Sequence, residues 1–117
     1  MKKTKMLKKN YEFKNVLTKG KYYSGDCIEA FIQTNKNKEI NLLGIAIGVK
    51  IAKATKRNKI KRLIRENYKN CENYTKTGNN IVFLWKKKVD TNQATFENIK
   101  KDMNKIFKKA KLFVEEE

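Results

Sequence analysis

Charge is distributed unevenly along this chain, and the pattern limits the folds that it can adopt. Positions 50–69 hold nine basic residues and one acidic residue, whereas positions 22–49 hold two basic and three acidic residues. The neutral blocks contain strand-like apolar runs, and the basic blocks show helical periodicity. A small sheet from the neutral segments, carrying basic helices and loops, accommodates both patterns. The sequence therefore predicts one mixed α+β domain over residues 1–117.

Helical periodicity marks both ends of the chain. Apolar side chains three and four positions apart predict a helix over residues 10–19, with Asn10 as its N-cap and Gly20 at its end. A second apolar stripe predicts a helix that begins near residue 91 or 92 and runs to about residue 110. The lysines of this last helix face away from the stripe, which is typical of a solvated surface.

Three segments have the pattern of strands. Residues 27–33 alternate with period two, which predicts an edge strand with Phe31 on its polar face. Residues 42–49 are nearly continuously apolar, as expected for the central strand, and residues 81–85 predict a shorter one. A further short strand around residues 22–23 stays open.

The most informative segment is a basic helix over residues 55–71, for which Thr55 is a candidate N-cap. All three arginines of the chain, Arg57, Arg62 and Arg65, lie within nine positions of each other. A planar guanidinium can hold phosphates and bases in ways that an ammonium cannot. At 100° per residue the arginines share one arc with Asn58, Lys61 and Lys69, and the apolar side chains lie opposite. The segment therefore predicts a nucleic-acid contact.

Composition excludes several classes of function. The chain has a net charge of +17, so polyanions are its expected partners, and its lack of histidine removes the commonest general base, the usual catalytic triads and most kinds of zinc site. Its two cysteines are far apart, as expected for free thiols in a reducing cytoplasm. Neither a signal peptide nor a membrane-spanning run is present, so a soluble, unexported protein is expected.

Residues 52–66 read Ala-Lys-Ala-Thr-Lys-Arg-Asn-Lys-Ile-Lys-Arg-Leu-Ile-Arg-Glu. This run resembles the RNR signature of the bacterial ribonuclease P protein subunit. Residues 7–20 are similar to the opening helix of that family, and residues 43–47 are similar to its central strand.

The resemblance implies an αβββαβα sandwich with a left-handed crossover around the basic helix. It implies an RNA-binding subunit of ribonuclease P, the ribonucleoprotein endonuclease that removes the 5′ leader from precursor tRNA. The implied partners are the catalytic RNA and the precursor tRNA leader, with no DNA and no membrane. The RNA subunit would hold the catalytic Mg²⁺ ions, so the protein itself would supply no catalytic residue, metal site or cofactor.

The resemblance also implies site residues. The residues that match the face docking on the catalytic RNA are Arg57, Asn58, Lys61, Arg62 and Arg65. The residues that match the cleft for the single-stranded leader are Phe13, Leu17 and Phe31, with Lys50 and Lys53 on its rim. An aromatic ring on a polar strand face can stack on an unpaired base. A place in the core is the alternative for Phe13 and Phe31, and the same two readings stay open for Trp85.

Two other functions compete. A small basic ribosomal or RNA-assembly protein would use the same helix without a cleavage partner. An autonomous nuclease would need clustered carboxylates to hold metal ions, and the acids here are scattered apart from those at 115–117.

Overall fold

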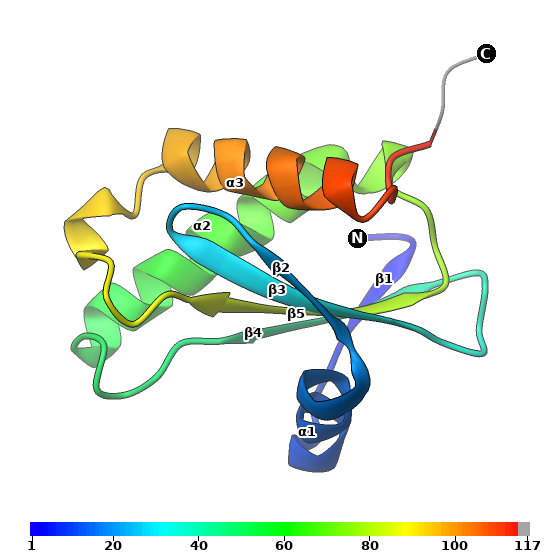
Figure 1. Cartoon of the computed structure of the whole chain (residues 1–117), viewed down its shortest axis with the longest axis horizontal. Coiled ribbons are helices and arrows are strands. Elements are labelled where there is room, and N and C mark those ends of the chain that lie inside the picture. Colours follow the sequence, from blue (N-terminus) through cyan, green and yellow to red (C-terminus); the bar gives the residue numbers. More distant parts are fainter. Residues whose placement is uncertain (115–117) are drawn as a thin grey trace.

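The computed structural model describes residues 1–114, so the acidic residues 115–117 lie outside the described part of the predicted domain. Its elements surround one five-stranded sheet (Figure 1). In chain order they are β1 (Thr4–Met6), α1 (Asn10–Lys19), β2 (Lys21–Ser24), β3 (Ile28–Thr34), β4 (Asn41–Ala46), α2 (Ala54–Cys71), a 3₁₀ turn η1 (Glu72–Tyr74), β5 (Asn79–Trp85), a second turn η2 (Thr91–Gln93) and α3 (Phe96–Lys109).

The strands are ordered β1-β4-β5-β3-β2, with β4 parallel to both β1 and β5 and the remaining pairs antiparallel. Helices α2 and α3 cover one face of the sheet and α1 covers the other (Figure 1). The mixed α+β prediction is confirmed, and β1 precedes the expected αβββαβα order.

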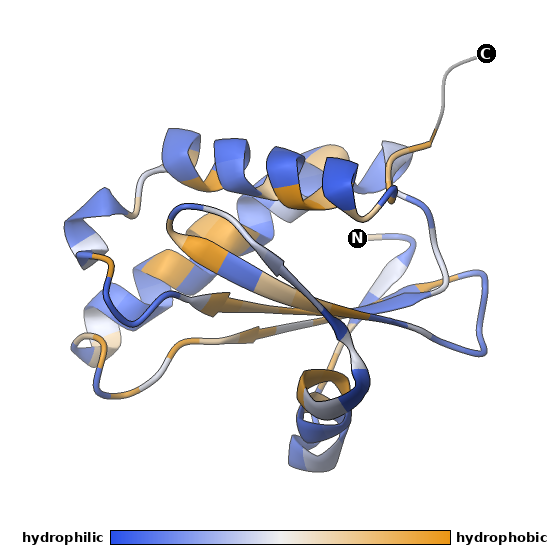
Figure 2. Cartoon of the chain, viewed as in Figure 1, coloured by the Kyte–Doolittle hydropathy of each residue, from blue (hydrophilic) through white to orange (hydrophobic). Residues whose placement is uncertain are grey.

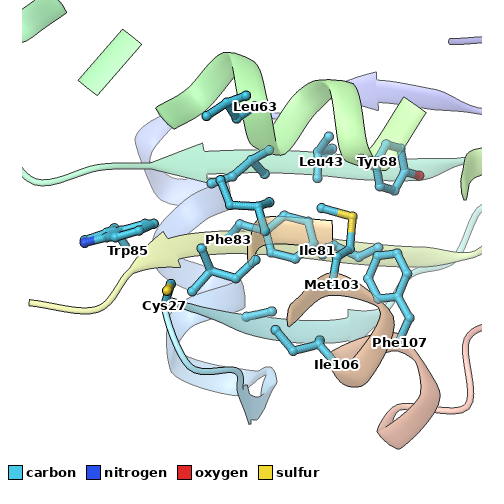
Figure 3. Close-up of a cluster of buried hydrophobic side chains, with 14 of the residues drawn as sticks. Cys27, Leu43, Leu63, Tyr68, Ile81, Phe83, Trp85, Met103, Ile106 and Phe107 are labelled. Carbon is cyan, nitrogen blue, oxygen red and sulfur yellow. The ribbon is translucent and has the colours of Figure 1, made fainter. Parts of the chain in front are cut away.

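The connection from β4 through α2 to β5 is left-handed. The two strands are parallel, and α2 crosses over one face of the sheet between them. Seen from the α2 side with both strands pointing up, β5 lies to the left of β4, whereas in a right-handed unit it would lie to the right (Figure 3). Crossovers between parallel strands are almost always right-handed, so this general preference alone would have predicted the wrong topology here.

Several strand positions differ from the sequence prediction. Strand β3 is not at the edge, because β2 and β5 flank it. The central strand is β5, which is buried along most of its length, and β4 is shorter than predicted and lies one place away from the centre. Strand β1 was missed, since three residues carry too little periodicity to be recognised.

The helices form where expected: α1 has the predicted bounds with a different N-cap, and α2 and α3 begin at other residues than predicted. Asn10 is the first residue of α1, and Lys9 is its N-cap. The N-cap of α2 is Lys53, two residues before the predicted cap Thr55, and the helix begins at Ala54. Helix α3 begins at Phe96, where the side chain of Thr95 accepts a hydrogen bond from the backbone N–H of Asn98 at 3.1 Å.

The main core lies between the sheet and helices α2 and α3 (Figure 3). The apolar sides of these helices turn inward and their outer sides are hydrophilic (Figure 2). Phe107 of α3 packs against both Phe83 and Tyr68, with ring centroids 5.9 and 6.3 Å away. Trp85 also belongs to this core, since it is 2% exposed and its Nε1–H donates to the carbonyl oxygen of Val89 at 2.9 Å. The core reading of Trp85 is therefore the correct one.

A buried carboxylate fixes the turn between β2 and β3. Asp102 of α3 is 2% exposed and accepts hydrogen bonds from the backbone N–H groups of Asp26, Cys27 and Ile28 at 2.7–3.0 Å. Gly25 approaches so closely that a Cβ there would lie 2.6 Å from the Asp102 carboxyl carbon. These contacts hold the β2–β3 hairpin against α3.

Candidate RNA interface

Helix α2 presents a basic face to solvent. Its opposite side, which includes Ile60, Leu63 and Ile64, is buried in the main core. This anchoring leaves a shallow, open depression along the outer side, lined by Thr55, Asn58, Lys59, Lys61, Arg62 and Arg65. Four of the five residues predicted to contact the catalytic RNA therefore lie together on one surface.

Arg57 lies apart from that depression. It is half-buried, and its Nη1–H donates to the carbonyl oxygen of Ala52 at 2.7 Å. This hydrogen bond ties the start of α2 to the loop that follows β4. Helical periodicity placed Arg57 on the basic arc but could not show this contact, because the Ala52 carbonyl belongs to the preceding loop.

Arg62 remains available to a ligand. Its Nε lies 3.9 Å from the Glu66 carboxylate, and both side chains are more than half exposed. Such a surface pair contributes little to stability, so an RNA phosphate can replace Glu66 as the partner of Arg62. It is the one ion pair between side chains of residues 1–114. No lysine side chain in this part of the chain is therefore paired with an acidic side chain.

A second surface is the groove between α1 and the sheet. Phe13 and Leu17 contribute from α1, and Leu84 contributes from β5. The complete lining is Asn10, Phe13, Leu17, Ile45, Ala46, Ile47, Gly48, Lys61 and Leu84. Phe13 is half-buried over Gly44, where a Cβ would lie 2.6 Å from its ring, and Leu17 is 36% exposed. The groove is thus mostly apolar, with one cation, Lys61, at its edge.

Phe31 borders this groove without lining it. Its ring is half-buried on the α1 side of the sheet, next to Val82, and the Tyr22 ring lies 5.2 Å from it between centroids. The sequence placed Phe31 on the correct face of β3. Its partial burial means that it packs in the small α1-side cluster and also keeps part of its ring accessible.

The two predicted rim lysines lie outside the groove lining. Lys50 lines a neighbouring depression with Val49, Ile51 and Lys87, which shares only Gly48 with the groove. Lys53 is exposed at the N-cap of α2. Lys61 instead belongs to both the groove and the basic face. Sequence reasoning assigned Lys61 to the basic face alone, since its neighbours across the groove come from α1 and β4.

The described residues offer few groups for covalent chemistry. Burial raises the pKa of both cysteine thiols, which keeps Cys27 and Cys71 protonated at neutral pH. Among residues 1–114, no three His, Cys, Asp or Glu side chains come together as a metal site. No helix in the described part of the chain has the length and apolar character to cross a membrane.

Comparison with known proteins decides the family. The family model described as Ribonuclease P matches residues 1–111. The chain belongs to the ribonuclease P protein family. The ribonuclease P protein component of Clostridium perfringens is 33% identical over 112 residues, covering 91% of this chain and 88% of its own. That of Clostridioides difficile is 33% identical over 113 residues and covers 96% of both chains.

Solved structures of ribonuclease P proteins have the same fold. The Staphylococcus aureus protein superposes with a TM-score of 0.78 at 31% identity, over 92% of this chain and 96% of its own. The Thermotoga maritima protein gives a TM-score of 0.79 over 90% and 96% of the two chains, and at 24% identity it supports the fold alone. This ribonuclease P protein is thus a bacterial protein component of the ribonucleoprotein endonuclease, and a ribosomal or assembly role is not favoured.

Proposed function

We propose that this chain binds the catalytic RNA of ribonuclease P through the basic face of α2 and the 5′ leader of precursor tRNA through the α1 groove. Asn58, Lys61, Arg62 and Arg65 would contact the RNA subunit directly. Arg57 would act by fixing the loop before the helix. Phe13, Leu17 and Phe31 would contact the leader, with Lys50 and Lys53 attracting its phosphates from outside the groove.

The observation that carries this proposal is that two surfaces of different character meet at Lys61. A polar, cationic face suits a folded RNA, whose phosphates are exposed and regularly spaced. An apolar groove with one aromatic ring in its lining, that of Phe13, and a second beside it, that of Phe31, suits a single strand, whose unstacked bases can lie against side chains. One small protein can therefore contact a ribozyme and its substrate at the same time.

The chemistry would belong to the RNA. Hydrolysis of the phosphodiester bond requires an activated water, and Mg²⁺ held by the RNA subunit would supply that activation. The protein would raise the affinity for substrates that carry a leader, and its positive charge would reduce the repulsion between the two RNAs. Neither DNA nor a membrane is needed as a partner, and the proposed location is the cytoplasm.

Reconstitution tests the proposal. The purified chain is added to a bacterial ribonuclease P RNA at low Mg²⁺ concentration, and cleavage of precursor tRNA is followed. We expect strong stimulation over the RNA alone and no cleavage by the chain alone. Absence of stimulation would favour a role outside ribonuclease P, and cleavage by RNA-free protein that survives further purification would refute the division of labour.

A further inference from the structure

Two polar side chains lie near the α1 groove and have no part in the function proposed above. The hydroxyl of Tyr22 on β2 donates a hydrogen bond to Oε2 of Glu29 on β3, with 2.7 Å between the oxygens. Tyr22 is 48% exposed and Glu29 is half-buried. The hydrogen bond to Glu29 raises the pKa of the Tyr22 phenol, so the phenol keeps its proton at neutral pH.

Strand register places this pair next to the proposed leader site. Glu29 lies directly opposite Leu84, which lines the groove, and Tyr22 lies opposite Phe31. Directly opposed residues of antiparallel strands have their side chains on the same face, about 5 Å apart at Cβ. The carboxylate, the phenol and the Phe31 ring therefore share the α1 side of the sheet.

The carboxylate is unusual for this surface. Within residues 1–114 Glu29 forms no ion pair although the chain carries a net charge of +17, and its Oε1 accepts no hydrogen bond from a described residue. A carboxylate repels RNA phosphates, so it does not serve backbone binding. An ionised carboxylate accepts hydrogen bonds only, and a phenol that donates to it also presents an acceptor.

We infer that Tyr22 and Glu29 form a base-reading subsite that selects guanine in the leader. The inference rests on the proposed function. The Watson–Crick edge of guanine carries two adjacent donors, N1–H and the N2 amino group, which match two adjacent acceptors. Adenine and cytosine each present one donor beside an acceptor, and uracil presents one donor between two acceptors. A base that stacks against the accessible part of Phe31 would bring this edge toward the pair.

The test uses the holoenzyme, assembled from this chain and a bacterial ribonuclease P RNA. Precursor tRNAs carry a uridine leader in which one guanosine is moved through successive positions, with adenosine and cytidine series for comparison and mature tRNA as the reference. With guanosine at one leader position, we expect the holoenzyme to bind the precursor tRNA about fivefold more tightly than with uridine there. This factor is at the lower end of the discrimination that a pair of hydrogen bonds to one base provides. Glu29→Gln, which replaces one acceptor by a donor, removes this preference, and Tyr22→Phe reduces it.

Glu39→Gln is the matched control, since Glu39 is an exposed acid in the β3–β4 turn, and it leaves the preference unchanged. Leader-dependent affinity that is equal for all four bases at every position overturns the inference and leaves the proposed function intact. A guanosine preference that persists in Glu29→Gln, or a uniform affinity loss with a lower melting temperature, also overturns it. Wild-type affinity that does not depend on a leader at all overturns the proposed function together with this inference.

Discussion

The substitution Arg62→Ala tests whether geometry or bulk charge governs docking on the catalytic RNA. Arg62 lies in the depression on α2, and its ion pair with Glu66 spans 3.9 Å between largely exposed groups. Breaking that pair costs the free protein at most about 1 kcal/mol. A charge-assisted hydrogen bond to a phosphate contributes about 1.5 to 3 kcal/mol, so Arg62→Ala should weaken RNA binding about 10- to 100-fold.

Two variants make the comparison sharp. Lys108→Ala removes the same charge from the exposed, lysine-rich side of α3, and we expect a loss of only about twofold, as for a distant, screened charge. Arg62→Lys keeps the charge and loses the planar fork, so its affinity should fall between wild type and Arg62→Ala. Filter binding at two salt concentrations gives the affinities, and melting temperatures should stay unchanged. Equal losses at Arg62 and Lys108 would show that only net charge matters.

Four further results are expected. Arg57→Ala should lower the melting temperature as well as RNA affinity, because it removes the hydrogen bond to Ala52; an effect on affinity alone would place Arg57 at the RNA. Phe31→Ala should weaken holoenzyme binding of precursor tRNA by about 1 to 3 kcal/mol while leaving mature tRNA unaffected, and parallel losses for both would make Phe31 a core residue. Asp102→Ala should destabilise the chain by about 3 kcal/mol or more in urea unfolding, since two buried N–H groups and one part-buried N–H group lose their acceptor; a loss below 1 kcal/mol would contradict this. Burial raises the pKa of Cys71 above its ordinary 9.0, so the unfolded chain loses that proton first and stability should fall as pH rises past about 9, less steeply in Cys71→Ala.

Local patterns in the sequence predicted those features that depend on neighbours along the chain. The 3.6-residue period separated Ile60 and Ile64 from Arg62 and Arg65, and the structure keeps that division. The two-residue period placed Phe31 on the face of β3 opposite Ile28 and Ile32, and the structure shows that α1 packs on that face. Both results follow because a side chain's direction in a helix or strand is set by its position in the repeat.

Features that depend on contacts between distant segments could not be predicted in this way. Asp102 looks like an ordinary polar residue of a helix, yet it is buried because the β2–β3 turn supplies its three donors from over 70 residues away. The place of Lys61 in the groove depends on α1 and β4, which are distant in sequence and lie beside it only in the folded chain. The handedness of the crossover came from the resemblance, since general rules favour the opposite hand.

The position of β5 in the strand order has a consequence for how this protein is made on the ribosome. Before β5 is synthesised, the sheet exists as two separate halves, the β2–β3 hairpin and the β1–β4 pair, with no ladder between them. Residues 79–85 close the sheet from the middle, pairing with β3 on one side and β4 on the other. A nascent chain that stops before residue 79 therefore exposes open strand edges on both halves, a state prone to aggregation. The sheet therefore cannot be completed until the last third of the chain has been made, and a slow step in synthesis upstream of β5 would prolong the exposure of both edges.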